Sequence, residues 1–125
     1  MMEIDICIND VITLRAALNK TETAQAIYSA LPLDAEGNTW GDEIYFTSGI
    51  KAPLIEPKEI LDVGDLAYWP PMQAICIFYG PTPASYGNEI RAAGPVSVFG
   101  KIIKGDLEAL KRLDGKVLVS IKKTM

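Results

Sequence analysis

Apolar residues recur at every second position in the first part of the chain. Isoleucine occupies alternate positions in the segment 3–9, and apolar residues occupy alternate positions in the segment 12–18. A period of two buries one face of a β-strand. Asn9-Asp10 lies between the two segments and is typical of a turn. The pattern therefore predicts a β-hairpin.

The apolar period changes to that of a helix in two later segments. The first runs from Thr21 to Pro32, with Thr21 or Thr23 available as the N-cap and the proline ending the run. The second begins after Asp106, which suits an N-cap, and stops at Gly115. The residues that share a face are Ala24, Ile27, Tyr28 and Leu31 in the first segment and Leu107, Leu110 and Leu113 in the second. Two short amphipathic helices are predicted.

Further strands are predicted in the middle and at the end of the chain. The run 74–79 carries no charge and is rich in isoleucine and aromatic residues, which is typical of a buried strand. Prolines on both sides of this run stop β-pairing, because proline has no backbone N–H to donate. Shorter strand patterns cover 66–69, 43–47 and 117–121. The segments Asp34 to Gly41 and Ser48 to Pro57 have no periodicity and are predicted to be loops.

Length and composition favour one domain. The chain has 125 residues, 49% of them hydrophobic, which is enough for one core and too little for two ordinary domains. A single domain over residues 1–125 is expected. No stretch approaches the ~20 apolar residues that a membrane-spanning helix needs, and Glu3 and Asp5 are unlike a basic, apolar leader. Cys7 and Cys76 are too far apart for a redox or zinc motif and are expected to be reduced. These features indicate a cytoplasmic protein.

The charge pattern bears on the kind of partner. The formal net charge is −4, and no cluster of lysine or arginine is interleaved with the aromatic residues. Neutralising nucleic-acid phosphates requires such a basic surface. We therefore expect no nucleic-acid partner, and the lack of a long apolar stretch predicts no membrane partner.

Three sequence blocks, in order, resemble the cyclophilin-like family of small bacterial and archaeal proteins, which is related in fold to the cyclophilin prolyl isomerases. The blocks are WGDEIYF at 40–46, GDLAYWPPMQAICIFYGPTP at 64–83 and VFGKIIKGDLEAL at 98–110. The segment 21–32 also lies where a cyclophilin has its first helix. The resemblance implies a mainly β fold, a closed antiparallel cyclophilin-like barrel of about eight strands capped by two short helices.

Prolyl isomerisation is one function that the resemblance implies, and the sequence departs from it. In cyclophilins an arginine in a Phe-His-Arg segment stabilises the twisted amide, whereas the corresponding strand here, 43–46, has acidic and aromatic residues. The chain has no histidine, and no tryptophan follows Pro83. Only Gln73 and the apolar run after it resemble the strand that lines the proline pocket. Arg15 or Arg91 would have to supply the missing arginine.

We favour a second hypothesis, in which the outer face of the barrel keeps a cyclophilin-like groove that binds a small molecule or a short peptide without the usual isomerase residues. Aromatic side chains offer a flat apolar wall, a methionine can adapt to a ligand's shape, and a glutamate suits a cationic or hydrogen-bond-donating ligand. The predicted ligand-binding residues are Glu43, Tyr45, Tyr68, Trp69, Met72 and Phe78. Taken singly, each aromatic residue is more typical of strand packing, and Glu43 is as typical of a solvated strand edge.

A third hypothesis is an interaction module or half of a homodimer, with Pro53, Pro57 and the turn after Trp69 at the contact surface. Other chemistries lack the residues that they need. Asp42 and Glu43 are neighbours in a strand and point to opposite faces, no histidine is present to activate a nucleophile, and no acidic loop suits a metal. We expect no cofactor and no metal site.

Overall fold

The predicted N-terminal hairpin is present in the computed structural model, which describes residues 2–125. Strands β1 (Glu3–Ile8) and β2 (Ile12–Leu18) pair antiparallel with Ile8 opposite Ile12. Asn9 and Asp10 have φ angles of 54° and 58°. They are the central residues of a β-turn that the Val11 N–H closes by donating to the Ile8 carbonyl oxygen at 3.1 Å. Such a turn needs the left-handed conformation at both central positions, and Asn and Asp tolerate it better than most residues. The hairpin prediction is confirmed.

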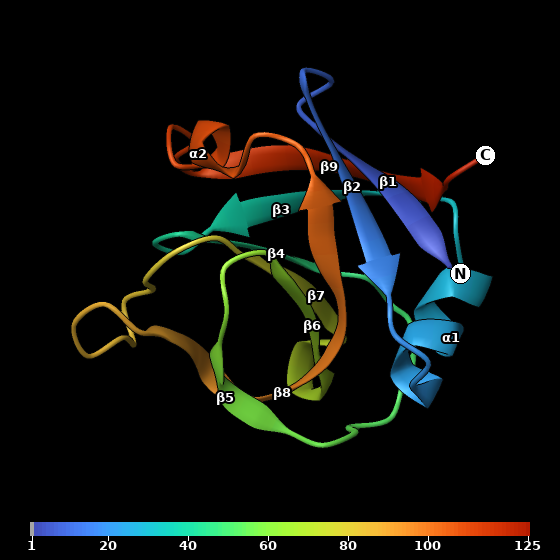
Figure 1. Cartoon of the computed structure of the whole chain (residues 1–125), viewed down its shortest axis with the longest axis horizontal. Helices are drawn as coiled ribbons and strands as arrows, with labels where there is room; N and C mark the ends of the chain where they lie inside the picture. Colours follow the sequence, from blue (N-terminus) through green and yellow to red (C-terminus); the bar gives the residue numbers. More distant parts are fainter. Residues whose placement is uncertain (1) are drawn as a thin grey trace.

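The strands form one ring of antiparallel pairings (Figure 1). The others are β3 (Leu33–Thr39), β4 (Glu43–Thr47), β5 (Lys58–Leu61), β6 (Asp65–Trp69), β7 (Ala74–Phe78), β8 (Ile90–Lys104) and β9 (Lys116–Lys123). They neighbour one another in the order β2-β1-β9-β3-β4-β7-β6-β8, and β8 pairs back with β2. Strand β5 is added to the first half of β8. A mainly β fold with its strands in a ring is confirmed.

Strand β3 corrects the prediction of a loop at 34–41. It pairs with β9 from Leu33, opposite Ile121, to Asn38, opposite Lys116. Its inward positions include Ala35 and Gly37, which are small and carry no strong apolar signal. A Cβ on Gly37 would lie 2.6 Å from the backbone oxygen of Tyr45. The close approach of β4 therefore requires a small residue at position 37. Because Ala35 and Gly37 are small, the segment lacks the alternating large apolar residues that would predict a strand.

Strand β8 changes partners in its middle. Its first half pairs with β5, with Lys58 opposite Val96, and its second half pairs with β6 and then β2. The first half of β8 thereby packs against the outer face of β6 and β7, where Ala92 and Val96 join a buried cluster with Cys76. This arrangement builds one wall of the site described below.

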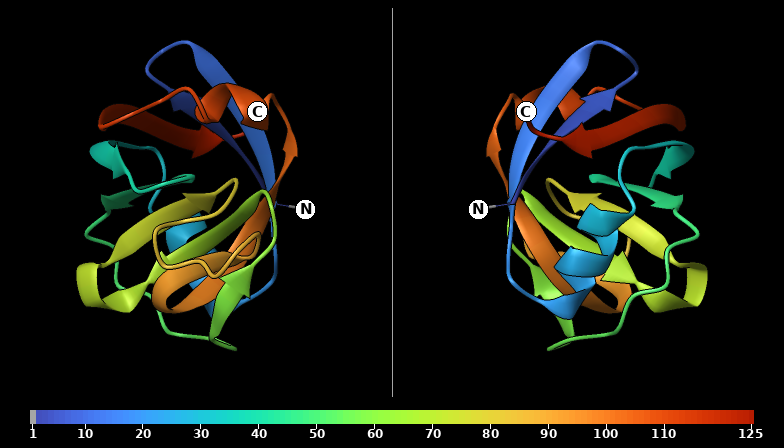
Figure 2. Two further views of the ribbon diagram at one scale, coloured as in Figure 1. Left: turned by 90° about the vertical axis from the view of Figure 1, so that its left-hand side faces the viewer. Right: turned by 90° about the vertical axis from the view of Figure 1, so that its right-hand side faces the viewer.

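Two short helices pack on the ring, as predicted. Helix α1 (Glu22–Ser29) has Thr21 as its N-cap, whose side chain accepts a hydrogen bond from the Ala24 N–H at 3.1 Å. Helix α2 (Leu107–Leu110) has Asp106 as its N-cap. Figure 2 shows α1 lying across one side of the ring. Within residues 2–125, no helix is long and apolar enough to span a membrane.

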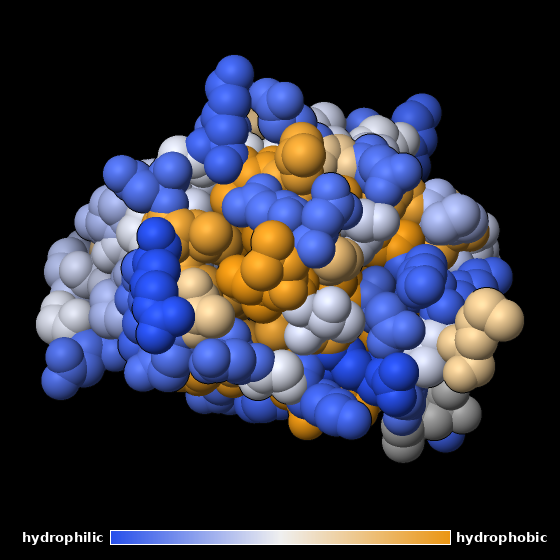
Figure 3. All heavy atoms as spheres, turned by 90° about the horizontal axis from the view of Figure 1, so that it is seen from above, coloured by the Kyte–Doolittle hydropathy of each residue, from blue (hydrophilic) through white to orange (hydrophobic). Residues whose placement is uncertain are grey.

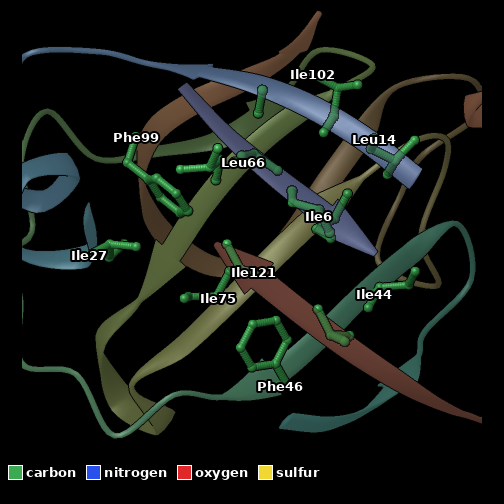
Figure 4. Packing of buried hydrophobic residues seen from close by; sticks show 14 of the residues in the cluster. Ile6, Leu14, Ile27, Ile44, Phe46, Leu66, Ile75, Phe99, Ile102 and Ile121 are labelled. Carbon is green, nitrogen blue, oxygen red and sulfur yellow. The ribbon is translucent and has the colours of Figure 1, made fainter. Parts of the chain in front are cut away.

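Two apolar clusters hold the fold together. The main cluster fills the ring, where side chains such as Ile6, Ile75 and Phe99 point toward a common centre (Figure 4). Ile27 of α1 and Leu110 of α2 belong to it. The second, smaller cluster lies on the outer face of the sheet and consists of Leu61, Ala67, Ala74, Cys76, Phe78, Ile90, Ala92 and Val96. The candidate site adjoins this second cluster.

Candidate functional site

Strands β4 and β7 bring four side chains together on the outer face of the ring. Glu43 is opposite Phe78 in the register, and Tyr45 is opposite Cys76. Ile44, between Glu43 and Tyr45, is fully buried in the main cluster. Because successive side chains of a strand point to opposite faces, the odd positions of β4 and the even positions of β7 share the outer face. Three of the predicted site residues therefore lie side by side.

A proline-stiffened turn places two more predicted residues at the rim. Strand β6 ends at Trp69, and Pro70–Met72 form a single turn of 3₁₀-helix. Gln73 then takes a left-handed conformation with φ of 50°, and β7 begins. Proline cannot continue the β-ladder, so the chain turns directly after Trp69. Trp69 is half-buried, and Met72 is exposed at the edge.

These residues enclose a cavity of about 180 Å³. Its complete lining is Trp40, Glu43, Tyr45, Trp69, Met72, Cys76, Phe78, Ala92, Ala93 and Val96. The last three come from the first half of β8. Gly94 of the same segment packs on Trp69, since a Cβ added there would lie 3.2 Å from the indole Nε1. The absence of a side chain at Gly94 lets β8 approach the tryptophan closely.

Tyr68 does not join the other predicted residues. It neighbours Trp69 in β6 and so points to the opposite face, into the main cluster. The side chain is 1% exposed, and its hydroxyl donates a hydrogen bond to the carbonyl oxygen of Ile50. That contact fixes the loop after β4 to the core. The structure therefore places Tyr68 in a packing role, away from the cavity.

Glu43 supplies the buried carboxyl group of the cavity. The residue is 5% exposed, and its Oε1 atom has no hydrogen-bond partner among residues 2–125. Burial raises the pKa of the Glu43 carboxyl from its ordinary value of 4.5 to about 7, and a hydrogen bond with the Cys76 thiol acts in the opposite direction. A carboxyl group in this position changes its charge near neutral pH.

Two neighbouring groups are affected by the same burial. Burial raises the pKa of the Cys76 thiol well above its ordinary value, and the charge of Glu43 and the hydrogen bond to it add to the effect. Cys76 is therefore a protonated, unreactive thiol. Burial, followed by the charges of Asp42 and Glu43, raises the pKa of Tyr79 to about 12. The surroundings of Glu43 are thus neutral or acidic.

The two arginines weighed for prolyl isomerisation lie outside the cavity lining. Arg15 on β2 pairs with Asp5 on β1 at 2.9 Å. Arg91 pairs with Glu89 at 2.8 Å, and its guanidinium lies over the ring of Tyr86. Within residues 2–125 the cavity has no basic side chain in its lining. The structure brings together aromatic walls and a carboxyl group, without an arginine.

Sequence reasoning missed five residues of the lining. Cys76 was available from the alternation, because it lies two positions before Phe78 in the same strand. Trp40 lies in the turn before β4, where its backbone N–H donates to the Glu43 carbonyl oxygen at 2.8 Å. The remaining three are Ala92, Ala93 and Val96 of β8. No local pattern marks these last residues, because they reach the site through the change of partners in β8.

Comparisons with known proteins identify relatives of this chain. The profile of a family described as cyclophilin-like matches residues 2–122. The solution structure of the hypothetical protein AF2241 from Archaeoglobus fulgidus is similar, with a TM-score of 0.81 and 34% sequence identity. The similarity covers 98% of this chain and 95% of that chain. No curated protein matches the chain significantly. From the fold, the family profile and this relative, we conclude that the chain belongs to the cyclophilin-like family.

Proposed function

We propose that the protein binds a small molecule or a short peptide in the cavity between β4, β7, the turn after β6 and the first half of β8. The ligand has an apolar part that packs on the aromatic rings and a group that interacts with Glu43. The protein acts by binding and does not catalyse prolyl isomerisation.

One observation carries this proposal: aromatic side chains converge around a buried carboxyl oxygen that has no partner within the described residues. A buried polar atom without a hydrogen bond costs about 1–3 kcal/mol. Small-molecule sites typically combine apolar and aromatic walls with a few such polar groups. A ligand that supplies the missing partner recovers this cost on binding.

The two tryptophans of the chain make the proposal testable, because both Trp40 and Trp69 line the cavity. We would screen a fragment set containing cationic, neutral and Ala-Pro dipeptide members by two-dimensional NMR and follow the two indole N–H signals. Fragments that bind should shift both signals. Trp69→Ala should weaken the binding of such fragments about tenfold or more, because it removes one wall of the cavity.

Tyr86→Ala provides the matched control. Tyr86 is 76% exposed and does not line the cavity, so its loss should leave fragment binding unchanged. Equal affinities of wild type and the Trp69 variant would contradict the proposed site. So would a screen in which no fragment moves either indole signal.

The absence of isomerase activity is tested separately. Cyclophilins stabilise the twisted amide with a positioned arginine, and the cavity lining within residues 2–125 contains no arginine or other basic side chain. NMR exchange spectra of an Ala-Pro peptide should show the same cis/trans exchange rate with and without the protein. Accelerated exchange would favour isomerisation through a rearranged site.

The interaction-module hypothesis stays a prediction. Of the residues weighed for it, the Pro53 carbonyl accepts a hydrogen bond from the Thr23 hydroxyl at 2.6 Å, and Pro57 is exposed. Apolar side chains also gather among polar ones on the face seen in Figure 3. Val11 and Leu118 are 81% and 55% exposed on the hairpin turn and β9. Monomers commonly expose apolar side chains, so this surface carries less weight than the cavity.

A further inference from the structure

A ligand group that donates a hydrogen bond or carries a positive charge would stabilise the buried oxygen of Glu43. The Glu43 side chain lies on the face shared by β4 and β7, where the residue is 5% exposed and the Cys76 thiol also lines the cavity. Its Oε1 atom lacks a hydrogen-bond partner across the described part of the chain. Leaving a charged carboxylate in this state is costly, and a bound cation offsets the cost.

In the described part of the chain, the groups that face Glu43 from the neighbouring elements supply no positive charge. On β4 and the turn before it lie Tyr45 and Asp42, and on β7 and its end lie Cys76 and Tyr79. The walls from the other elements are uncharged: Trp69 and Met72 from β6 and the turn, and Ala92, Ala93 and Val96 from β8. Within residues 2–125, no lysine or arginine contributes to the lining.

The walls are also of the type that attracts cations. Four of the lining residues are aromatic: Trp40, Tyr45 and Trp69 are half-buried, and Phe78 is fully buried at the base of the cavity. The face of an aromatic ring attracts a cation, and tryptophan does so most strongly. Aromatic rings and one buried carboxyl group therefore favour the same sign of charge in the same small space.

The size and the apolar walls of the cavity select among cations. Its volume is about 180 Å³, whereas an apolar cavity of about 150 Å³ accommodates benzene. The site thus takes a compact head group of similar size. A bare ammonium is strongly hydrated and loses that hydration on entry, whereas an alkylated ammonium carries apolar groups that gain from burial.

We propose that the cavity takes the cationic head of an alkylated amine, with Glu43 as its counter-ion and the rings of Trp40, Tyr45 and Trp69 as its walls. This inference rests on the proposed function of the same cavity and specifies its ligand class. A neutral ligand that accepts a hydrogen bond from a protonated Glu43 is the competing possibility, and the experiment below separates the two.

The test uses a charged probe and its neutral carbon isostere, choline and 3,3-dimethylbutan-1-ol. Binding is followed by tryptophan fluorescence and by the two indole N–H signals at about pH 8 and about pH 5.5. At the higher pH, choline should bind about tenfold or more tightly than the alcohol. At the lower pH, protonation of Glu43 should reduce this preference by about tenfold or more, with the affinity of the alcohol nearly unchanged.

Glu43→Gln should abolish the preference for choline at both pH values, and Glu36→Gln, an exposed glutamate on β3 outside the lining, should preserve it. The pH dependence is measured on the wild-type protein and needs no variant. If both probes bind equally well, or the alcohol binds better, the cationic ligand class is wrong while the cavity remains a binding site. If neither probe binds, the cationic inference is also overturned, and the fragment screen decides independently whether the cavity binds anything.

Discussion

The burial of Glu43 bears on stability as well as on the proposed ligand preference, because its carboxyl group is buried without a basic neighbour in the described cavity lining. An exposed glutamate on a strand has little effect on folding. In this protein the register of β4 and β7 places the carboxyl group beside Phe78 and closes it off from water. The position of this residue on the outer face therefore contributes to how the free energy of unfolding depends on pH.

The pH dependence of stability follows from the raised pKa. Burial holds the pKa of folded Glu43 at about 7, compared with the ordinary 4.5 that it regains on unfolding. The folded state binds the proton more tightly, so the contribution of Glu43 to stability is full below about pH 4.5 and is lost as the pH rises to about 7. This difference corresponds to about 3 kcal/mol. Glu43→Gln should remove the loss.

Urea unfolding of wild type and Glu43→Gln at several pH values between about 4 and 8 measures this effect. The variant should gain about 3 kcal/mol relative to wild type across this range. Other titrating groups cancel in the comparison, including Asp5, whose pKa is lowered chiefly by its hydrogen bond with Arg15. Glu36→Gln should follow the wild-type curve. Parallel curves for wild type and Glu43→Gln would show that Glu43 titrates alike in both states.

At the scale of elements, capping explains why α1 forms where the sequence predicted it. The Thr21 side chain accepts from the Ala24 N–H at 3.1 Å and donates to Asn19 Oδ1 at 2.7 Å. The helix is only eight residues long, so its termini weigh heavily on its stability. Its buried residues Ala24 and Ile27 then attach it to the main cluster. Local chemistry and packing agree at this element.

Removing the cap should therefore destabilise the protein measurably. Thr21→Ala leaves the N–H of Ala24 without its side-chain acceptor and should cost about 1 kcal/mol of unfolding free energy. Thr21→Ser keeps the hydroxyl and should cost only a few tenths of a kcal/mol, roughly the difference between good caps. Chemical denaturation of the three proteins gives these values. Equal stability of the Ala and Ser variants would mean that packing alone fixes this end of α1.

Strand β3 is an element that the hydrophobic pattern of the sequence did not predict. The pattern at 33–39 does alternate, with Asp34, Glu36 and Asn38 exposed, but the inward partners are small. Gly37 is required by the backbone of β4, which lies too close for any side chain. Periodicity detects a strand from its large apolar residues, so a strand selected for close packing escapes it.

At the scale of the whole molecule, the ring depends on the seam between β2 and β8. Leu18 is opposite Gly100, and the Asn19 N–H donates to the Phe99 carbonyl oxygen at 3.0 Å. A Cβ on Gly100 would lie 2.7 Å from Leu18 Cδ2 and 2.8 Å from the backbone oxygen of Ala17. The two strands therefore meet without room for one more carbon atom, and this contact joins segments about eighty positions apart in the chain.

Gly100→Ala should open the seam. Because a backbone atom blocks the new methyl group, the strands must separate, at an expected cost of about 2 kcal/mol. Gly94→Ala, the same change in the first half of β8, meets only the edge of the Trp69 indole and should cost about 0.5 kcal/mol or less. Denaturation measures the cost, and hydrogen exchange at the Asn19 amide reports the opening. Equal costs for the two variants would contradict a tight seam.

The sequence alone determined the hairpin, the start of α1, the strands β4, β6 and β7, and which side chains of each strand share a face. Turn chemistry, capping and the period of two act between near neighbours, so they are visible in a single chain. The same period separates Tyr68 from Trp69 and joins Cys76 to Phe78. Only the tertiary structure decided that β8 would pack over this face, that Trp40 would join the lining, and that Glu43 would be buried there. These features arise from contacts between distant segments, and burial of a charge has no meaning until those segments exclude water from it.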